Sequence, residues 1–305
     1  MREAVFLVEA GAKSGMGHLR RCSVLARELS KRGVACQFGI NTHEGRSIMD
    51  TFPVADYKSA LAKTWDILIV DGYHFESKNL SKWKNECRIL VLVDDLAQKP
   101  LPAHIVLNHN IYGESLDYKA YPANIVLSGP KFTLVDPAFS KLRKNRVIEN
   151  SSILVAFGGG DTANQGLLAA AELAAITEGT IIDVAMGTSK RRIDHPNISV
   201  HEKANMVKLM SKTALYFGAL GVSFIEALAA GLPVVGVMTA DNQILAADAA
   251  RRLGIPVFDL NELDKAAKKA ASLVKHKQFA KLEVMDGLGA KRVANEILAF
   301  NCVIV

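Results

Sequence analysis

The sequence predicts an α/β protein made of two Rossmann-like domains that face each other across a cleft. Apolar, strand-like segments alternate with helical segments along the chain, as in parallel sheets with helices on both faces. A glycine-rich turn follows the first strand of each half, and 305 residues, half of them hydrophobic, suffice for two cores. Because ligands of such sheets bind beyond the carboxyl ends of the strands, we expect functional residues there.

The first domain is predicted to comprise residues 1–146. The polar and basic segment Phe139–Arg146 precedes a new apolar strand, so we place the linker between the domains in that segment. Strands are expected at Ala4–Val8, Val34–Ile40, Asp66–Val70, Arg88–Val93, Ile105–Leu107 and Ile125–Leu127, and helices at His18–Lys31 and around Ser77–Lys84.

The second domain, residues 147–305, is predicted to repeat this plan. Alanine- and lysine-rich helices after Leu260 are expected to face solvent on one side. The expected strands are Ser152–Phe157, Thr180–Met186, Ala214–Phe217 and Pro233–Val237, and the expected helices are 163–174, Ser223–Ala230 and Asn242–Leu253.

The segment Gly15–Cys22 follows the first strand and begins a helix. Its glycines allow the backbone to approach a ligand closely, and the helix N-terminus favours negative charge. His18 lies on the first turn and can exchange protons near neutral pH. Such a loop suits chemistry on a phosphorylated or nucleotide-linked substrate. Glycine-rich turns are common in open α/β proteins, however, so a purely structural turn is an equally good interpretation.

The dinucleotide-binding fingerprint is met only loosely. The second strand, Val34–Ile40, has no acidic residue at its end, where a ribose-binding carboxylate is expected. A nicotinamide-dependent enzyme is therefore the weaker interpretation, and no cofactor is expected.

Composition narrows the class of protein further. The net charge of +6 suits acidic small molecules, but the basic residues are dispersed and aromatic residues are few, so binding of nucleic acid is not favoured. The four cysteines show no CxxC spacing, which argues against a zinc site and a disulfide framework. With no secretory signal and no apolar run of about 20 residues, we expect a cytoplasmic protein without a membrane segment, by default a monomer.

Two further turns in the second half are candidate phosphate sites. Gly158, Gly159 and Asp161 lie in a tight turn before one helix, and Gly221 and Ser223 lie in a turn before another. The two helix N-termini and their backbone amides could bind a diphosphate. Glu226 lies one turn into the second helix. Its carboxylate is either a ligand of ribose hydroxyls or a solvated side chain, and the sequence leaves both interpretations open. Asn242 and Gln243 begin a later helix after Asp241, which we interpret as its N-cap.

The order of eight short motifs carries a family resemblance across residues 5 to 255. They are Gly15–His18 with Arg21 and Cys22, Val70–Tyr73, Val93–Ala97, Leu107–Asn110, Gly129–Phe132, Gly158–Asp161 with Asn164, the Glu226 helix, and Asn242–Gln243. In this order they resemble the nucleotide-sugar hydrolases of pseudaminic acid biosynthesis and the related spore coat polysaccharide proteins. These proteins are similar in architecture to the glycosyltransferase that adds N-acetylglucosamine to the peptidoglycan lipid precursor.

The resemblance implies a glycosyltransferase-B-like (GT-B-like) fold and metal-independent hydrolysis of a UDP-linked 2,4-diacetamido-2,4,6-trideoxy sugar, with inversion at the anomeric carbon. It implies that His18 is the catalytic base and that Tyr73 and Asn242 line the reaction site. It also implies that Glu226 binds the ribose and that the diphosphate is bound by the turns of Gly158, Gly159, Gly221 and Ser223. The remaining substrate contacts that it implies are Gly15, Gly17, Arg21, Asp161 and Gln243.

Three alternatives stay open at this point. A glycosyltransferase of the same fold would pass the sugar to an alcohol in place of water, and a silent protein would only bind the sugar nucleotide. The pair Asp94 and Asp95 could bind a divalent metal, but with no third acidic ligand nearby we favour hydrogen bonds to neighbouring loops.

Overall fold

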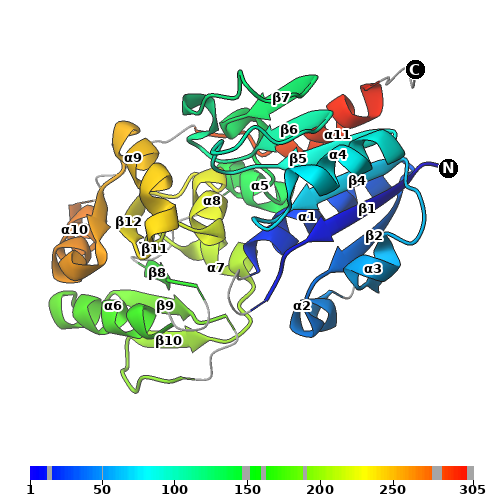
Figure 1. Cartoon of the computed structure of the whole chain (residues 1–305). Helices are drawn as coiled ribbons and strands as arrows, with labels where there is room; N and C mark the ends of the chain where they lie inside the picture. Colours follow the sequence, from blue (N-terminus) through cyan, green and yellow to red (C-terminus); the bar gives the residue numbers. More distant parts are fainter. Residues whose placement is uncertain are drawn as a thin grey trace. The chain divides into compact units, whose positions relative to one another are not determined.

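The computed structural model describes residues 1–11, 16–49, 51–145, 152–158, 163–187, 191–276 and 284–300, and the chain forms two compact units (Figure 1). Unit 1 combines Met1–Val135 with Leu288–Val305, and unit 2 is Asp136–Gly287. The chain therefore passes from one unit to the other twice. This division differs from the expected domains 1–146 and 147–305 at the first boundary and in the return of the C-terminal segment.

Unit 1 contains a parallel sheet of seven strands in the order β3-β2-β1-β4-β5-β6-β7. The order reverses at β1, so the carboxyl ends of β1 and β4 form the switch point at which such sheets bind ligands. The strands are β1 (Glu3–Val8), β2 (Ala35–Ile40), β3 (Val54–Ala55), β4 (Ile67–Asp71), β5 (Ile89–Val93), β6 (Ile105–Asn108) and β7 (Ile125–Ser128).

Helices cover both faces of this sheet because successive side chains of a strand point to opposite faces. In β1, Phe6 packs in one core with α1 (Gly17–Ser30) and α11 (Gly289–Ala299), and Leu7 packs in the other with α3 (Tyr57–Ala60) and α4 (Ser77–Glu86). The remaining helical segments are α2 (His43–Ile48), η1 (Gly113–Ser115) and η2 (Pro130–Phe132).

The C-terminal helix α11 belongs to unit 1 because of specific contacts. A Cβ on Gly289 would lie 2.2 Å from the carbonyl oxygen of Thr133, so only glycine permits this approach of the helix. Arg2 donates from Nη1 to the carbonyl oxygen of Leu298, at 3.1 Å. Val293 and Ile297 are fully buried in the same core as α1.

Unit 2 repeats the strand order of unit 1, with a parallel sheet ordered β10-β9-β8-β11-β12-β13. Its switch point lies at the carboxyl ends of β8 and β11. The strands are β8 (Ser152–Ala156), β9 (Ile181–Ala185), β10 (Ile198–His201), β11 (Leu215–Ala219), β12 (Val234–Met238) and β13 (Val257–Asp259). The helices are α5 (Pro137–Asn145), α6 (Ala163–Ile176), α7 (Met206–Lys212), α8 (Val222–Ala229), η4 (Asp241–Gln243), α9 (Ile244–Arg252), η5 (Leu260–Glu262) and α10 (Leu263–His276).

The segment expected to be a linker instead forms helix α5. It packs against α7 and α8 within unit 2, and Arg143 donates from Nη2 to the carbonyl oxygen of Leu228, at 2.9 Å. The basic side chains that suggested a solvated linker thus include one that fixes the helix to its neighbour.

Every strand expected from the sequence is present, with each end at most two residues from its expected position. The predicted α/β class with two Rossmann-like domains is confirmed. The strands β3, β10 and β13 were not predicted; they have two to four residues each. Within the described ranges, each helix is too short or too polar to cross a membrane.

Candidate functional site

His18 and Asp71 meet at the switch point of unit 1. Parallel pairing of β1 with β4 places Asp71, the last residue of β4, beside Val8, the last residue of β1. Helix α1 begins at Gly17 and carries His18 on its first turn. His18 Nδ1 consequently lies 2.6 Å from Asp71 Oδ1, with both side chains buried.

This contact defines the tautomer of the histidine. A carboxylate oxygen can only accept, so we assign the hydrogen to Nδ1, which donates it to Asp71. Arg21 Nη2 also lies 2.9 Å from Nδ1, but its two hydrogens go to the carboxylates of Asp71 and Asp95. Nε2 then holds the lone pair, and among the described residues nothing hydrogen-bonds to it. His18 therefore presents a proton acceptor, held in one orientation by a buried carboxylate.

Arg21, one turn further along α1, uses all five of its N–H donors within unit 1. Its Nε and Nη2 donate to the two carboxylate oxygens of Asp71, at 2.7 and 2.6 Å. Its Nη1 and Nη2 donate to those of Asp95, each at 2.9 Å, and Nη1 also donates to His109 Nε2 at 2.7 Å. Arg21 is only 6% exposed. The sequence led us to expect a substrate contact here, and the occupied donors argue for an internal role.

The carboxylate of Asp95 accepts hydrogen bonds from several side chains of the same cluster. Besides Arg21, it accepts from Asn110 Nδ2 at 2.7 Å and from the hydroxyl of Tyr73 at 3.1 Å. The ring of Tyr73 meets the ring of His18 edge to face, with centroids 5.2 Å apart. The two residues expected in unit 1 as catalytic groups are thus brought together.

The pKa values follow from these contacts. Burial alone would raise the pKa of Asp71, but Arg21 and His18 outweigh it and hold that pKa well below its usual range. Asp95 behaves likewise, with Arg21 the main opposing charge. Burial and then Asp95 raise the pKa of Tyr73, which keeps its hydroxyl a neutral donor. Burial, assisted by Arg21, lowers the pKa of His109 to about 3.

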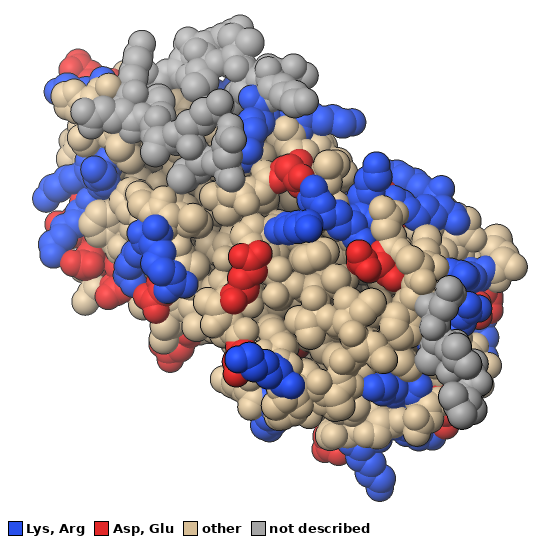
Figure 2. All heavy atoms as spheres, turned by 90° about the horizontal axis from the view of Figure 1, so that it is seen from above, with Lys and Arg blue, Asp and Glu red and all other residues tan. Residues whose placement is uncertain are grey.

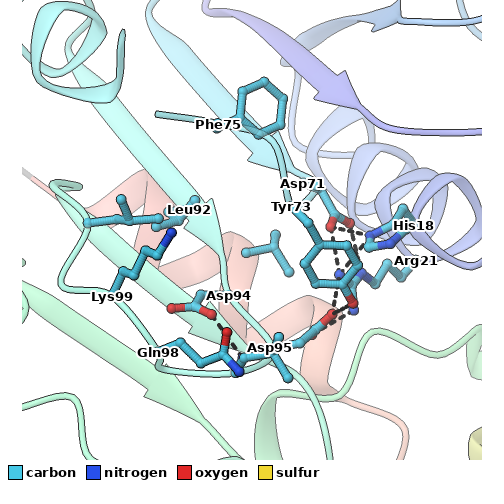
Figure 3. A pocket seen from close by; sticks show the side chains of 14 residues that line it. His18, Arg21, Asp71, Tyr73, Phe75, Leu92, Asp94, Asp95, Gln98 and Lys99 are labelled. Carbon is cyan, nitrogen blue, oxygen red and sulfur yellow. Dashed lines mark hydrogen bonds and ion pairs between the residues drawn. The ribbon is translucent and has the colours of Figure 1, made fainter. Parts of the chain in front are cut away.

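A hollow of about 210 Å³ opens beside this cluster (Figure 3). Figure 3 shows Asp71, His18, Arg21, Tyr73 and Asp95 converging from one side, linked by hydrogen bonds and ion pairs. The side chains of Leu92, Asp94, Gln98 and Lys99 lie on the other side.

In unit 2 the expected nucleotide residues lie around its own switch point. Gly158 follows β8 with φ of +92°, and Gly221 is the N-cap of α8, with no side-chain cap on the helix. Because no side chain in the described part of the chain caps α8, its first N–H groups are available to donate to a bound acceptor. Ser223 lies on the first turn and Glu226 on the next, where its side chain is buried.

Asn242 and Gln243 are also in unit 2, within η4. Asn242 is exposed, whereas Gln243 accepts from the backbone and hydroxyl of Thr239, at 2.8 and 3.2 Å. Asp241, expected as an N-cap, lies inside the first turn, and Ala240 is in the cap position. Gly15, Gly159 and Asp161 lie outside the described residues.

Asp94 has the structural role that the sequence favoured. It accepts from the backbone of Leu96 and Ala97 and from the hydroxyl of Tyr121, so it fixes its own loop. In the described part of the chain, groups of three His, Cys, Asp or Glu that could hold a metal are absent. On the face seen in Figure 2, Lys and Arg side chains lie in several separate groups with Asp and Glu between them.

The network contains three residues to which the sequence assigned no part in the reaction: Asp71, Asp95, which was weighed only as half of a metal-binding pair, and His109. Each ends a strand of the first sheet or follows its end within two residues. Their position beyond the carboxyl ends of parallel strands was the signal that could have found them.

Comparisons with known proteins give one functional lead and one structural result. No family model matches the chain. It is 26% identical over 235 residues to the UDP-2,4-diacetamido-2,4,6-trideoxy-β-L-altropyranose hydrolase of Campylobacter jejuni, covering 69% of this chain and 82% of that protein. It is 25% identical over 272 residues to an uncharacterized protein of Methanocaldococcus jannaschii, covering 75% of this chain but spanning only 54% of that protein.

Solved structures of glycosyltransferases share the fold. The glycosyltransferase of kitacinnamycin matches with a TM-score of 0.69 and 14% identity, covering 97% of this chain and 98% of that one. The calicheamicin glycosyltransferase CalG4 matches with a TM-score of 0.65 and 15% identity, covering 98% of each. Together with two parallel sheets that share the order of six strands, these matches show that the chain has a GT-B-like fold.

Proposed function

We propose that this protein hydrolyses a UDP-linked 2,4-diacetamido-2,4,6-trideoxy sugar at the anomeric C–O bond, releasing UDP and the free sugar. The observation that carries the proposal is the buried pair of His18 and Asp71 at the switch point of unit 1. It leaves Nε2 as a proton acceptor on a residue that lines the hollow. A hydrolase without a metal needs such a base to activate water.

In the proposed reaction, a water molecule donates a proton to His18 Nε2 as its oxygen attacks the anomeric carbon. The bond from that carbon to the UDP oxygen breaks, and its electron pair leaves with UDP. Attack on the face opposite the leaving group inverts the anomeric configuration. The products are the sugar with a new hydroxyl, UDP, and a proton on His18.

Unit 2 carries the groups that we assign to UDP. The open amides at the start of α8, with Gly221 and Ser223, suit the negative charge that develops on the leaving diphosphate. We assign the ribose hydroxyls to Glu226, and we propose that Asn242 and Tyr73 each contact the sugar during the reaction. The similarity to the Campylobacter hydrolase supports a sugar nucleotide as the substrate class.

Release of UDP from a panel of UDP-amino sugars tests this proposal. We expect release without any acceptor, and in water labelled with ¹⁸O the UDP should remain unlabelled because the C–O bond breaks. Label in UDP would contradict cleavage at the anomeric carbon. Release that requires an added alcohol would identify a glycosyltransferase, and thermal stabilisation by UDP without release would identify a binding protein.

A further inference from the structure

We propose that Asp71 and Arg21 form a positioning pair that holds His18 in the Nδ1–H tautomer. This inference rests on the proposed function, in which His18 is the base. Neither residue of the pair contacts substrate; both act through the imidazole ring.

Asp71 has every acceptor position filled by the cluster. Oδ1 accepts from His18 Nδ1 and Arg21 Nη2, each at 2.6 Å, and Oδ2 accepts from Arg21 Nε at 2.7 Å and Cys22 Sγ at 3.2 Å. The side chain is completely buried. An acceptor so fully bound keeps one orientation, and the ring that donates to it is fixed with it.

Arg21 makes this arrangement possible. Asp71 and Asp95 are two buried carboxylates, and without a cation between them one would take up a proton. Arg21 bonds to both oxygens of each and thereby keeps both ionised, as their lowered pKa values indicate. A protonated Asp71 could no longer serve His18 as a purely accepting partner.

The charges of the cluster also suit proton uptake. At rest it holds one cation, Arg21, and two anions, Asp71 and Asp95, while His109 is neutral because its pKa is lowered to about 3. A proton on His18 brings the cluster from a net negative charge to neutrality. When His18 takes a proton from water in the proposed reaction, the carboxylate of Asp71 lies 2.6 Å from the ring that gains the positive charge.

The test is the tautomer of His18, read from ¹⁵N–¹H correlation spectra of histidine-labelled protein and assigned by its loss in His18→Asn. The wild-type protein should show Nδ1–H and an unprotonated Nε2. In Asp71→Asn, the one amide oxygen accepts from Arg21, the amide NH₂ faces Nδ1, and the hydrogen should move to Nε2. The kcat for UDP release should fall about 10²–10⁴-fold with KM nearly unchanged.

A matched control exists in unit 2. Asp183 is also buried, lies 2.6 Å from His201 Nε2 and has a second cationic neighbour in Lys212. Asp183→Asn breaks a comparable buried contact and should leave the His18 signals and kcat unchanged. A loss seen only in Asp71→Asn is then due to the pair and not to a general loss of stability.

Two results would overturn the positioning pair: an Nε2–H tautomer in the wild-type protein, or an Asp71→Asn variant with wild-type tautomer and kcat. The wild-type spectrum decides even if the variant does not fold. If the tautomers behave as expected but no nucleotide sugar releases UDP, the pair stands and the assigned reaction alone fails.

Discussion

Arg21 Nη1 lies 2.7 Å from His109 Nε2, and because arginine only donates, the imidazole nitrogen must accept. His109 is therefore neutral in the folded protein, in agreement with a pKa lowered to about 3 by burial and by Arg21. Its other nitrogen, Nδ1, is buried and has no hydrogen-bond partner in the described part of the chain. The folded state thus resists protonation of a group that the unfolded chain protonates below about pH 6.5.

This difference predicts a loss of stability in mild acid. Between pH 7 and 5 the unfolded chain takes up a proton on His109 that the folded chain does not, so stability falls with pH by about 2 kcal/mol. His109→Gln, which keeps an acceptor for Arg21, should be less stable at pH 7 but should lose that part of the pH dependence. Urea unfolding at both pH values measures it. His43→Gln, at an exposed position, should keep the wild-type slope, and an unchanged slope in His109→Gln would refute the argument.

Replacement of His18 should abolish turnover without affecting the nucleotide. His18→Asn removes the Nε2 acceptor, and we expect kcat for UDP release to fall at least about 10²–10⁴-fold. UDP affinity, measured by calorimetry, should stay within a few-fold because the groups that we assign to UDP are in unit 2. His74→Asn is the control, since His74 is largely exposed and pairs with Glu9 on the same strand-end loops. Turnover near the wild-type rate in His18→Asn would exclude the proposed base.

Most strands of both sheets were predictable because buried parallel strands are short apolar runs, whereas β3 and β13 are too short to give such a signal and β10 is not an apolar run. His18 was predictable from its place on a helix that follows the first strand. Asp71 and Asp95 could have been predicted from the same rule, since both stand where strands of the first sheet end.

The role of Arg21 could not be predicted in this way. A charged side chain is rarely buried, and its burial here depends on two carboxylates and a histidine from three other strand ends. The packing of α11 in unit 1 could not be predicted either. It depends on the fit of Gly289 against Thr133, a contact between segments far apart in the chain. Local composition also misled at α5, where a basic segment is a packed helix.

Two glycines at the switch point of unit 2 should respond oppositely to alanine. A Cβ on Gly218 would lie 2.0 Å from the carbonyl oxygen of Ala156, a backbone clash between β11 and β8, whereas a Cβ on Gly221 meets open space. Gly218→Ala should cost about 1–3 kcal/mol or more of unfolding free energy. Gly221→Ala should be as stable as the wild-type protein but bind UDP more weakly, because its methyl group enters the space that we assign to the diphosphate. Denaturation and calorimetry measure both, and wild-type UDP affinity in Gly221→Ala would remove Gly221 from the diphosphate site.

Glu226 offers the sharpest test of the nucleotide site, because both groups of the proposed hydrogen bond can be removed: the carboxylate from the protein and the ribose hydroxyl from the ligand. If its carboxylate accepts from a ribose hydroxyl, Glu226→Ala should weaken UDP binding about 10–100-fold, the range for a hydrogen bond to a charged group. The wild-type protein should bind 2′-deoxy-UDP or 3′-deoxy-UDP with a similar loss, and the variant should not distinguish that analogue from UDP. Glu262→Ala, at a carboxylate outside α8, should bind all three ligands as the wild-type protein does. A purely structural role for Glu226 would lower stability while preserving the discrimination between UDP and its deoxy analogues, because the hydroxyl would then have its partner elsewhere.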